Sequence, residues 1–370
     1  MSKRKRVRLN SHEASILGLD VKANEIDRNT ARYYLDEEQL QELKILQSNH
    51  VQNTPLSIKA TSTLEDGEGN IKLQWIKRDK TEEDRLIALR TAIDTLKEDI
   101  EPAKPVKKVN DQYNKKLCNQ YTLTDYHLGM MAWSEESGDD WDLKIAENTL
   151  VRFFEIAMSE SPNAKECIFA QIGDFLHWDG LDAVTPASKH VLDADTRFTK
   201  LVRVAIRVIK RVIKMLLEKY DKVKLIMAEG NHDPASSVWL REMFDSFYED
   251  EPRLFVDTNP DPYYCVTFGK VCLFYHHGHK KSFKTVESAF IGKFKKEFGN
   301  SDFVYGHTGH LHHSKEESNL MVLEQHRTLA AKDAYSSRGG YLSGRDSKVI
   351  TYHKKFGEVK RSTISINMLK

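Results

Sequence analysis

Five short polar motifs, each directly after an apolar, strand-like stretch, are the part of this 370-residue sequence best suited to chemistry. The motifs are Asp125-Tyr126-His127, Gly173-Asp174, Gly230-Asn231-His232-Asp233, His276-His277-Gly278-His279 and Gly309-His310-Leu311-His312. Glycine, asparagine and aspartate are ordinary turn residues, so any one motif alone is typical of a loop. Open α/β sheets bind ligands outside the carboxyl ends of their strands, and five motifs in such positions indicate a shared site.

The residue types in these motifs favour metal binding. Asp125 and His127 are one residue apart, so both side chains are expected to leave the same face of an extended backbone. A carboxylate and an imidazole that converge in this way form a pair of metal ligands. A mixed set of imidazole, carboxylate and amide ligands suits Mn, Fe or Zn and disfavours Ca.

Short apolar strands that alternate with longer helices are expected to hold the motifs in place. Strands are predicted at residues 117–124, 166–172 and 222–227, and helices at 143–159, 195–220 and 236–248. Further strand-like runs occupy residues 264–268, 271–276, 303–305, 349–352 and 362–366. This alternation predicts a layered α/β domain.

The five motifs, in this order, resemble the calcineurin-like metallophosphoesterase family. The resemblance covers residues 117–370 and implies an α/β fold, a four-layer α/β/β/α sandwich with the motifs on loops at one end. Residues 1–108 lie outside it and form an appended N-terminal α+β module. A looser resemblance, in overall pattern only, is to metallophosphoesterases of bacteriophages that are similar to repair exonucleases.

The resemblance implies a site with two divalent metal ions, for which we expect Mn²⁺, with Fe or Zn also suitable. The ligands of the first ion would be Asp125, His127, Asp174 and His312. Those of the second would be Asp174, Asn231, His277 and His310, so that Asp174 bridges the pair. His232 would act catalytically beside the leaving-group oxygen, and Asp233 would orient or polarise it.

Several neighbouring histidines allow other assignments. Gly306-His307 offers a competing register for the last motif, but the residue two beyond His307 is Gly309, which cannot bind a metal. His307 and His313 are therefore expected to contact ligands or substrate, and His276 is a weaker candidate ligand. His177 and His279 are candidate substrate contacts, although a structural role for His177 is equally open.

The N-terminal module is predicted to combine helices with a hairpin. Residues 11–50 have helical patterns in pieces, the last at residues 36–47, and a helix-turn-helix with Arg28, Arg32, Tyr33 and Tyr34 facing DNA is one interpretation. A small helical docking element is the other. A hairpin is predicted at residues 56–77, a helix at 81–100 and a linker at 101–108. Lys3 to Arg8 form a basic arm, either a nucleic-acid contact or a solvated tail.

Composition sets the broad class of the protein. Charged residues make up 30% and apolar residues 40% of a chain with net charge +1, which is ordinary for a soluble globular protein. No membrane-spanning run or export signal is apparent, so a cytoplasmic protein without a membrane partner is expected. The four cysteines contain no Cys-x-x-Cys pair and are predicted to be reduced thiols. The long apolar helix at 195–220 permits a homodimer.

The substrate must be inferred from residues outside the metal motifs. Phosphoprotein phosphatases of this family usually continue the second motif as Gly-Asp-x-x-Asp-Arg, whereas here His177 and Trp178 stand at the last two positions. Lys332, Arg338 and Arg345 are candidate phosphate contacts. Together with the basic arm and the possible helix-turn-helix they favour a phosphodiesterase acting on DNA. The alternatives are hydrolysis of a small nucleotide or cyclic dinucleotide, and a non-catalytic metal-bearing binding protein.

Overall fold

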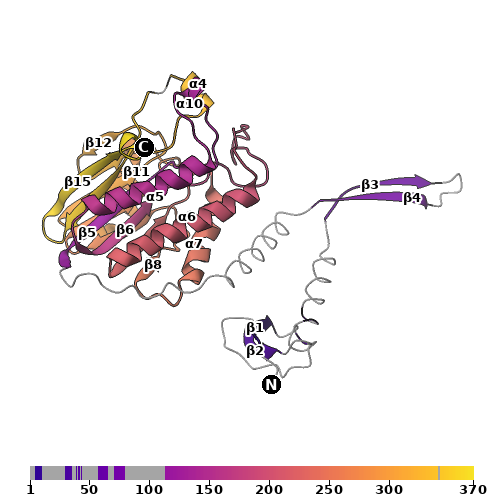
Figure 1. Cartoon of the computed structure of the whole chain (residues 1–370), viewed down its shortest axis with the longest axis horizontal. Helices are drawn as coiled ribbons and strands as arrows, with labels where there is room; N and C mark the ends of the chain where they lie inside the picture. The colour runs from indigo at the N-terminus through magenta and orange to yellow at the C-terminus, as the bar shows by residue number, and fades with distance from the viewer. Residues whose placement is uncertain are drawn as a thin grey trace. The chain divides into compact units, whose positions relative to one another are not determined.

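A computed structural model of the chain describes residues 5–10, 30–35, 39, 41, 43, 57–65, 71–79, 113–340 and 342–370. The chain divides into two compact units, Met1–Asp99 and Ile100–Lys370 (Figure 1). The predicted helix at 81–100 and linker at 101–108 lie outside the described residues, as does Arg28. Among the described residues, no helix is long and apolar enough to cross a membrane.

The described part of the N-terminal unit consists mainly of two antiparallel strand pairs. Strands β3 (Ser57–Glu65) and β4 (Ile71–Asp79) form the predicted hairpin. Strands β1 (Lys5–Asn10) and β2 (Thr30–Leu35) pair over their whole lengths, with Arg8 opposite Arg32 and Val7 opposite Tyr33. The proposed helix-turn-helix is therefore wrong in its recognition segment, because residues 32–34 are extended in β2. Residues 39, 41 and 43, within the predicted helix 36–47, are helical.

The larger unit contains a six-stranded sheet whose central strands carry three of the motifs. The strand order is β15-β14-β5-β6-β7-β8, in which β5 to β8 are parallel and β14 and β15 are antiparallel additions at one edge. The bounds are β5 Asn114–Leu123, β6 Ala164–Gln171, β7 Lys222–Met227, β8 Leu254–Val256, β14 Asp346–His353 and β15 Gly357–Ser365.

A five-stranded sheet, in the order β12-β13-β11-β10-β9, carries the other two motifs. Strands β10, β11 and β13 are parallel, and β9 and β12 pair antiparallel at the edges. The bounds are β9 Tyr264–Phe268, β10 Val271–Tyr275, β11 Phe303–Thr308, β12 Lys315–Ser318 and β13 Val322–Gln325. The strand predicted at 362–366 begins earlier, at Gly357, in β15, and the other predicted strands agree with these bounds to within three residues. Strands β8, β12 and β13 were not predicted from sequence.

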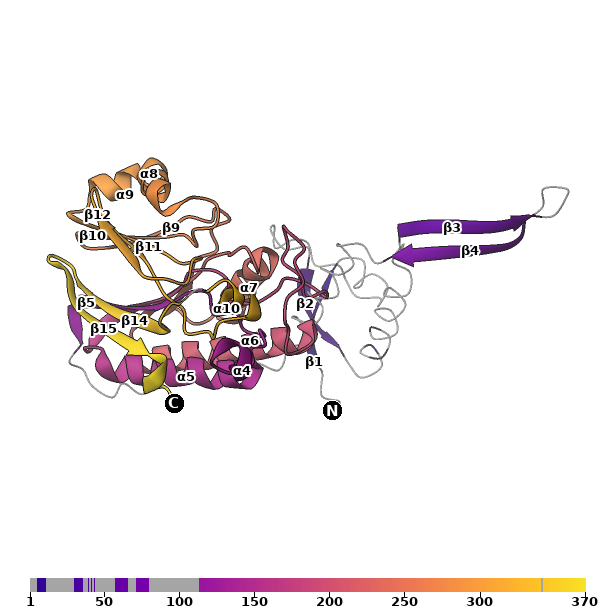
Figure 2. The same cartoon turned by 90° about the horizontal axis from the view of Figure 1, so that it is seen from above.

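The two sheets pack face to face with helices outside both. Ile168 and Ile226 of the larger sheet meet Val266 and Leu273 of the smaller one in the core between them. Phe169, next to Ile168 along β6, points to the opposite face and contacts Phe154 of helix α5, as the two-residue period of a strand requires. Figure 2 shows the resulting order of layers, which is the predicted four-layer α/β/β/α sandwich.

Helices α5 (Leu143–Glu160), α6 (Phe198–Lys219) and α7 (Pro234–Phe247) accompany the six-stranded sheet, and α8 (Phe283–Lys293) covers the five-stranded one. The Asp142 side chain caps α5 by accepting the N–H of Ile145. Most apolar residues of α6 are buried within the domain. The homodimer stays a prediction. The short helices are α4 Ser134–Ser137, α9 Lys295–Gly299, α10 Ala334–Arg338 and the 3₁₀ turn Ile366–Met368.

Candidate metal centre

The five motifs meet at the carboxyl ends of neighbouring parallel strands. Asp125 and His127 follow β5, Asp174 follows β6 and Asn231 follows β7, while His277 and His310 follow β10 and β11 of the other sheet. The motifs also hydrogen-bond to one another through the backbone, for example Asp125 N–H to Gly173 C=O at 3.0 Å and Gly309 N–H to His277 C=O at 2.9 Å. The sandwich therefore brings both sheets' strand ends into one site.

Backbone strain concentrates at this site. Among the described residues, six non-glycine residues have positive φ, and five of them are predicted ligands: Asp125, His127, Asp174, His310 and His312. The expectation that Asp125 and His127 leave one face of an extended strand is wrong, because β5 ends at Leu123 and both residues are left-handed. Each such conformation costs about 1–3 kcal/mol and persists where the surrounding structure fixes it, typically at functional sites.

Two motif glycines allow the loops to approach the carboxylates closely. A Cβ on Gly230 would lie 1.8 Å from Asp174 Oδ1 and 2.3 Å from the Asp174 backbone nitrogen. A Cβ on Gly309 would lie 1.9 Å from Thr124 Oγ1 and 2.5 Å from Asp125 Oδ2. Only glycine fits at either position, which explains the glycine that precedes Asn231 and the one that precedes His310.

The first group of candidate ligands surrounds Asp174 and consists of the residues predicted to bind the second ion. His277 Nε2 lies 3.0 Å from Asp174 Oδ2 and 3.2 Å from Asn231 Oδ1, and a nitrogen of His310 completes the group within 4.8 Å. The Nδ1–H of His277 donates to the carbonyl of Ile172 at 2.8 Å, which leaves Nε2 facing two oxygen acceptors. A backbone N–H of His232 holds the other carboxylate oxygen, Oδ1, at 2.8 Å.

The second group surrounds Asp125, which is fully buried. His312 Nε2 lies 3.1 Å from Asp125 Oδ1, and His127 Nε2 lies 3.3 Å from His312 Nε2. Backbone and hydroxyl donors hold the carboxylate, with His310 N–H at 2.9 Å and Thr124 Oγ1 at 2.6 Å from Oδ2. His277 Nε2 is also only 3.9 Å from Asp125 Oδ1, so the two groups adjoin each other. The bridging role of Asp174 stays a prediction.

The electrostatics of the two groups fit divalent cations. Burial alone would raise the pKa values of Asp125 and Asp174, but the positive charges of His312 and His277 outweigh burial and lower both. Burial lowers the pKa of His277, yet Asp174 and Asp125 raise it to about 10. Asp125 likewise raises the pKa of His312, so each imidazole favours the ionised form of the carboxylate beside it. Divalent ions can take the place of that positive charge, since metal ligation requires neutral imidazole and ionised carboxylate.

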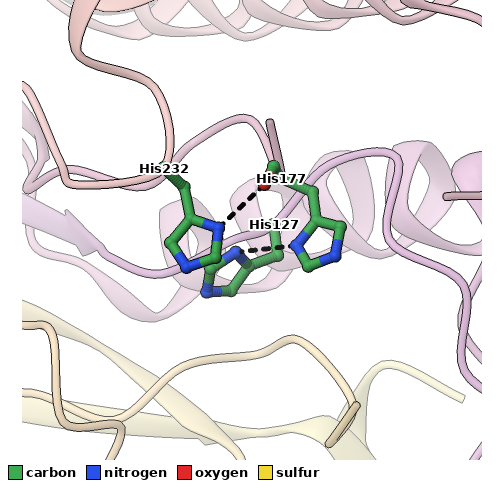
Figure 3. A group of neighbouring side chains, drawn as sticks. All are labelled: His127, His177 and His232. Carbon is green, nitrogen blue, oxygen red and sulfur yellow. Dashed lines mark hydrogen bonds between the residues drawn. The ribbon is translucent and has the colours of Figure 1, made fainter. Parts of the chain in front are cut away.

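His232 lies beside the second group, near His127 and His177 (Figure 3). Its ring centre is 4.7 Å from that of His127, and its Nδ1–H donates to the His177 carbonyl at 2.8 Å. The His177 side chain contacts His127 through their Nδ1 atoms at 3.2 Å and is buried. His232 is therefore held through Nδ1, which leaves its other ring nitrogen, Nε2, outside this hydrogen bond.

The Asp233 carboxylate holds the loops of the site in place and does not orient the His232 side chain. It accepts the N–H of Leu176 at 2.9 Å and that of Gly230 at 3.1 Å, so it ties the second motif's loop to the third. Burial and the nearby charge of Asp174 raise the pKa of Asp233 to about 8. The predicted orienting contact on His232 belongs instead to the His177 carbonyl. The contact between His232 and this carbonyl could not be predicted from sequence, because every residue type has a backbone carbonyl.

The other predicted substrate contacts differ in their surroundings. His279 lies near His310, with ring centres 6.4 Å apart, and Lys332 is half-buried just before α10. Arg338 instead pairs with Glu136 at 2.8 Å, and Arg345 donates to the Leu329 carbonyl at 2.7 Å and pairs with Asp139. Both arginines therefore have partners within the domain, and their role as phosphate contacts stays a prediction.

Three further candidate histidines, His276, His307 and His313, differ in burial and in their contacts. His276 is buried, stacks on Tyr263 at 4.3 Å and accepts the Gly278 N–H, whereas His313 is exposed. His307 is buried. Its Nδ1 lies 2.9 Å from His326 Nε2, and its Nε2 lies 3.0 Å from the Tyr352 hydroxyl. His326 and nearby Glu324 were not among the residues predicted from sequence. Glu324 is paired with Arg361 at 2.8 Å and with Lys348, so its charge is already balanced.

Comparisons with known proteins add little to this geometry. The sequence matches no protein-family model and no curated protein. Solved structures with a similar arrangement include a Streptococcus pneumoniae protein described as a predicted phosphoesterase, with 10% identity over 67% of this chain and 98% of that one and a TM-score of 0.28. A dimetal phosphatase from Danio rerio has 8% identity over 67% and 98% of the two chains and a TM-score of 0.35. Because these TM-scores are low, the function must be inferred from the residues of the site.

Another similar structure is a 5′-nucleotidase from Candida albicans, with 14% identity and a TM-score of 0.32. The similarity covers 71% of this chain but only 53% of the nucleotidase, so the two differ substantially in extent.

The close approach at Gly230 leads to a testable prediction. Gly230→Ala should lower the affinity for Mn²⁺ at least about tenfold, because the new methyl group must displace the Asp174 carboxylate. It should also lower stability by about 1–3 kcal/mol. Gly180→Ala is the matched control, because its Cβ meets no atom within 4 Å. Equal Mn²⁺ affinity of the two variants by calorimetry would contradict the role assigned to Gly230.

Proposed function

We propose that this protein is a dinuclear metal-dependent phosphodiesterase that acts on DNA. The observation that carries the proposal is the pair of adjoining ligand groups, one around Asp125 and one around Asp174, with His232 beside them. Two bound divalent ions would neutralise a phosphoryl group, activate the attacking water and stabilise the leaving oxygen. Mn²⁺ is our proposed metal, and Fe and Zn also suit the imidazole, carboxylate and amide donors.

The residues of the chain divide the remaining work. The predicted ligands fix the position of the scissile phosphate, and the backbone N–H groups of His310 and His232 keep both carboxylates in place. His232, anchored through Nδ1, directs Nε2 to the leaving-group oxygen and gives it a proton or hydrogen bond. A group placed in this way typically contributes 10²- to 10⁴-fold to the rate.

DNA is proposed as the substrate on the charge of residues near the centre. Lys280 and Lys281 follow the fourth motif directly and line a cavity that includes His310. The first strand of the N-terminal unit also contains three basic residues, Lys5, Arg6 and Arg8. Lysines and arginines of this kind bind phosphates without reading sequence, as a DNA-cleaving enzyme of broad specificity requires.

The proposal predicts Mn²⁺-dependent cleavage of DNA by the full-length protein. Labelled single- and double-stranded DNA, a cyclic dinucleotide and a phosphomonoester would each be incubated with Mn²⁺ or with EDTA. EDTA should lower the cleavage of DNA by more than about 10³-fold, because no other group in the site can supply the electrophile. Hydrolysis of the cyclic dinucleotide alone would discard DNA but retain the metal site. Absence of hydrolysis with Mn²⁺, Fe²⁺ and Zn²⁺ would favour a binding protein.

A further inference from the structure

A cavity of about 310 Å³ adjoins the candidate metal centre on the side of His310. The loop after β10 and the loop after β11 form its walls, and both loops contain predicted ligands. Its lining includes Gly309 and His310 from the last motif, Gly278 and His279 from the fourth, and Lys280 and Lys281 directly after it. A molecule that occupies this cavity would therefore be in contact with the residues that surround the scissile phosphate.

The charged side chains that line this cavity are all basic. Lys280 and Lys281 are both exposed, and neither forms an ion pair with a residue in the described part of the chain. The residues that line the cavity include no aspartate or glutamate. His279 also lines it, and the Nδ1 atom of His279 has no hydrogen-bond partner among the described residues. Ammonium groups without an ion-pair partner, next to an imidazole that can still form a hydrogen bond, are suited to binding a phosphate group.

A second cavity provides the opposite case. It has a volume of about 600 Å³ and is lined by residues around α4 and the start of α5, none of them a predicted metal ligand. Five carboxylates line it, from Glu136, Asp140, Asp142, Asp193 and Asp195, and no lysine or arginine does. A polyanion would be repelled from this cavity.

We propose that the cavity at Lys280 and Lys281 binds the phosphate that neighbours the scissile one in a polynucleotide. This inference rests on the proposed function, because it assumes that the scissile phosphate lies at the metal centre. The cavity shares His310 with that centre, so the anion it holds would be the next along the strand. A substrate with one phosphate, such as bis(p-nitrophenyl) phosphate, would leave the cavity empty.

The test is the relative use of these two kinds of substrate by a double variant. For Lys280→Ala/Lys281→Ala, the ratio of kcat/KM on a single-stranded oligonucleotide to kcat/KM on bis(p-nitrophenyl) phosphate should fall roughly tenfold. The dependence of log KM for the oligonucleotide on log salt should also become shallower, by about 0.7 for each phosphate contact that is lost. Lys280→Arg/Lys281→Arg should keep most of the ratio, because it keeps both charges.

Lys295→Ala/Lys296→Ala is the matched control, since these adjacent lysines are exposed on α9 and do not line the cavity. If the ratio falls equally in this control, or in neither variant, the inference is overturned while the proposed function stands. If the wild-type protein hydrolyses bis(p-nitrophenyl) phosphate but no oligonucleotide, the proposed DNA substrate fails, and the inference fails with it. The two failures are therefore distinguishable in one set of measurements.

Discussion

His232→Ala is expected to lower kcat for DNA by 10²- to 10⁴-fold while bound Mn²⁺ stays near the wild-type amount. The Nδ1 of His232 is committed to the His177 carbonyl at 2.8 Å, so Nε2 is the atom available to a leaving group. His232 also belongs to a group with His127 and His177 whose three imidazoles could themselves hold a metal ion, so bound metal must be measured beside the rate. Retention of metal in the variant would therefore separate proton donation from ligation. Metal content would be measured by elemental analysis after dialysis.

The leaving group gives a sharper test of His232. p-Nitrophenolate leaves without receiving a proton, whereas the alkoxide of DNA needs one, so the loss on bis(p-nitrophenyl) phosphate should be much smaller than the loss on DNA. His190→Ala, at an exposed histidine away from the motifs, is the matched control. An equal loss on both substrates would show that His232 acts in positioning or binding instead. Wild-type rates on DNA would remove it from the mechanism.

The sequence predicts the sandwich well because apolar periodicity and strand length set its layers. Strand β7 and strand β9 have the predicted bounds, and helix α5 differs from prediction by a single residue. These segments are apolar where they contact the core, so their pattern records their burial. The N-terminal module was less predictable. The strand at Thr30–Leu35 pairs with Lys5–Asn10, about twenty residues earlier, and a local helical pattern contains no information about that partner.

The convergence of the predicted site residues could be foreseen from sequence, but their individual contacts could not. Every predicted ligand lies in or beside one of the two adjoining groups, because residue type and position at a strand end were both visible in sequence. The left-handed backbone of Asp125 and His127 was not visible, since glycine or asparagine is the usual sign of positive φ. The His177 carbonyl and the pairing of Arg338 with Glu136 also depend on tertiary structure alone.

Asp174→Asn should produce the largest loss of metal of any single substitution. Asp174 is buried and lies 3.0 Å from His277 Nε2, and it accepts the backbone N–H of His232 at 2.8 Å. Asparagine keeps the shape of the side chain and can still accept that N–H, so the loops should remain folded. The change removes one of the two buried negative charges that attract the cations.

Mn²⁺ affinity should therefore fall by more than about 100-fold in Asp174→Asn, beyond the loss typical of a residue that only supports a ligand. Asp257→Asn is the matched control, because Asp257 follows β8 at the same edge of the sheet and accepts the Asn259 N–H. Circular dichroism would check that both variants are folded, and calorimetry would measure Mn²⁺ binding. If Asp174→Asn binds two Mn²⁺ ions with wild-type affinity, the carboxylate does not hold the metals, and the centre must be assigned to other residues.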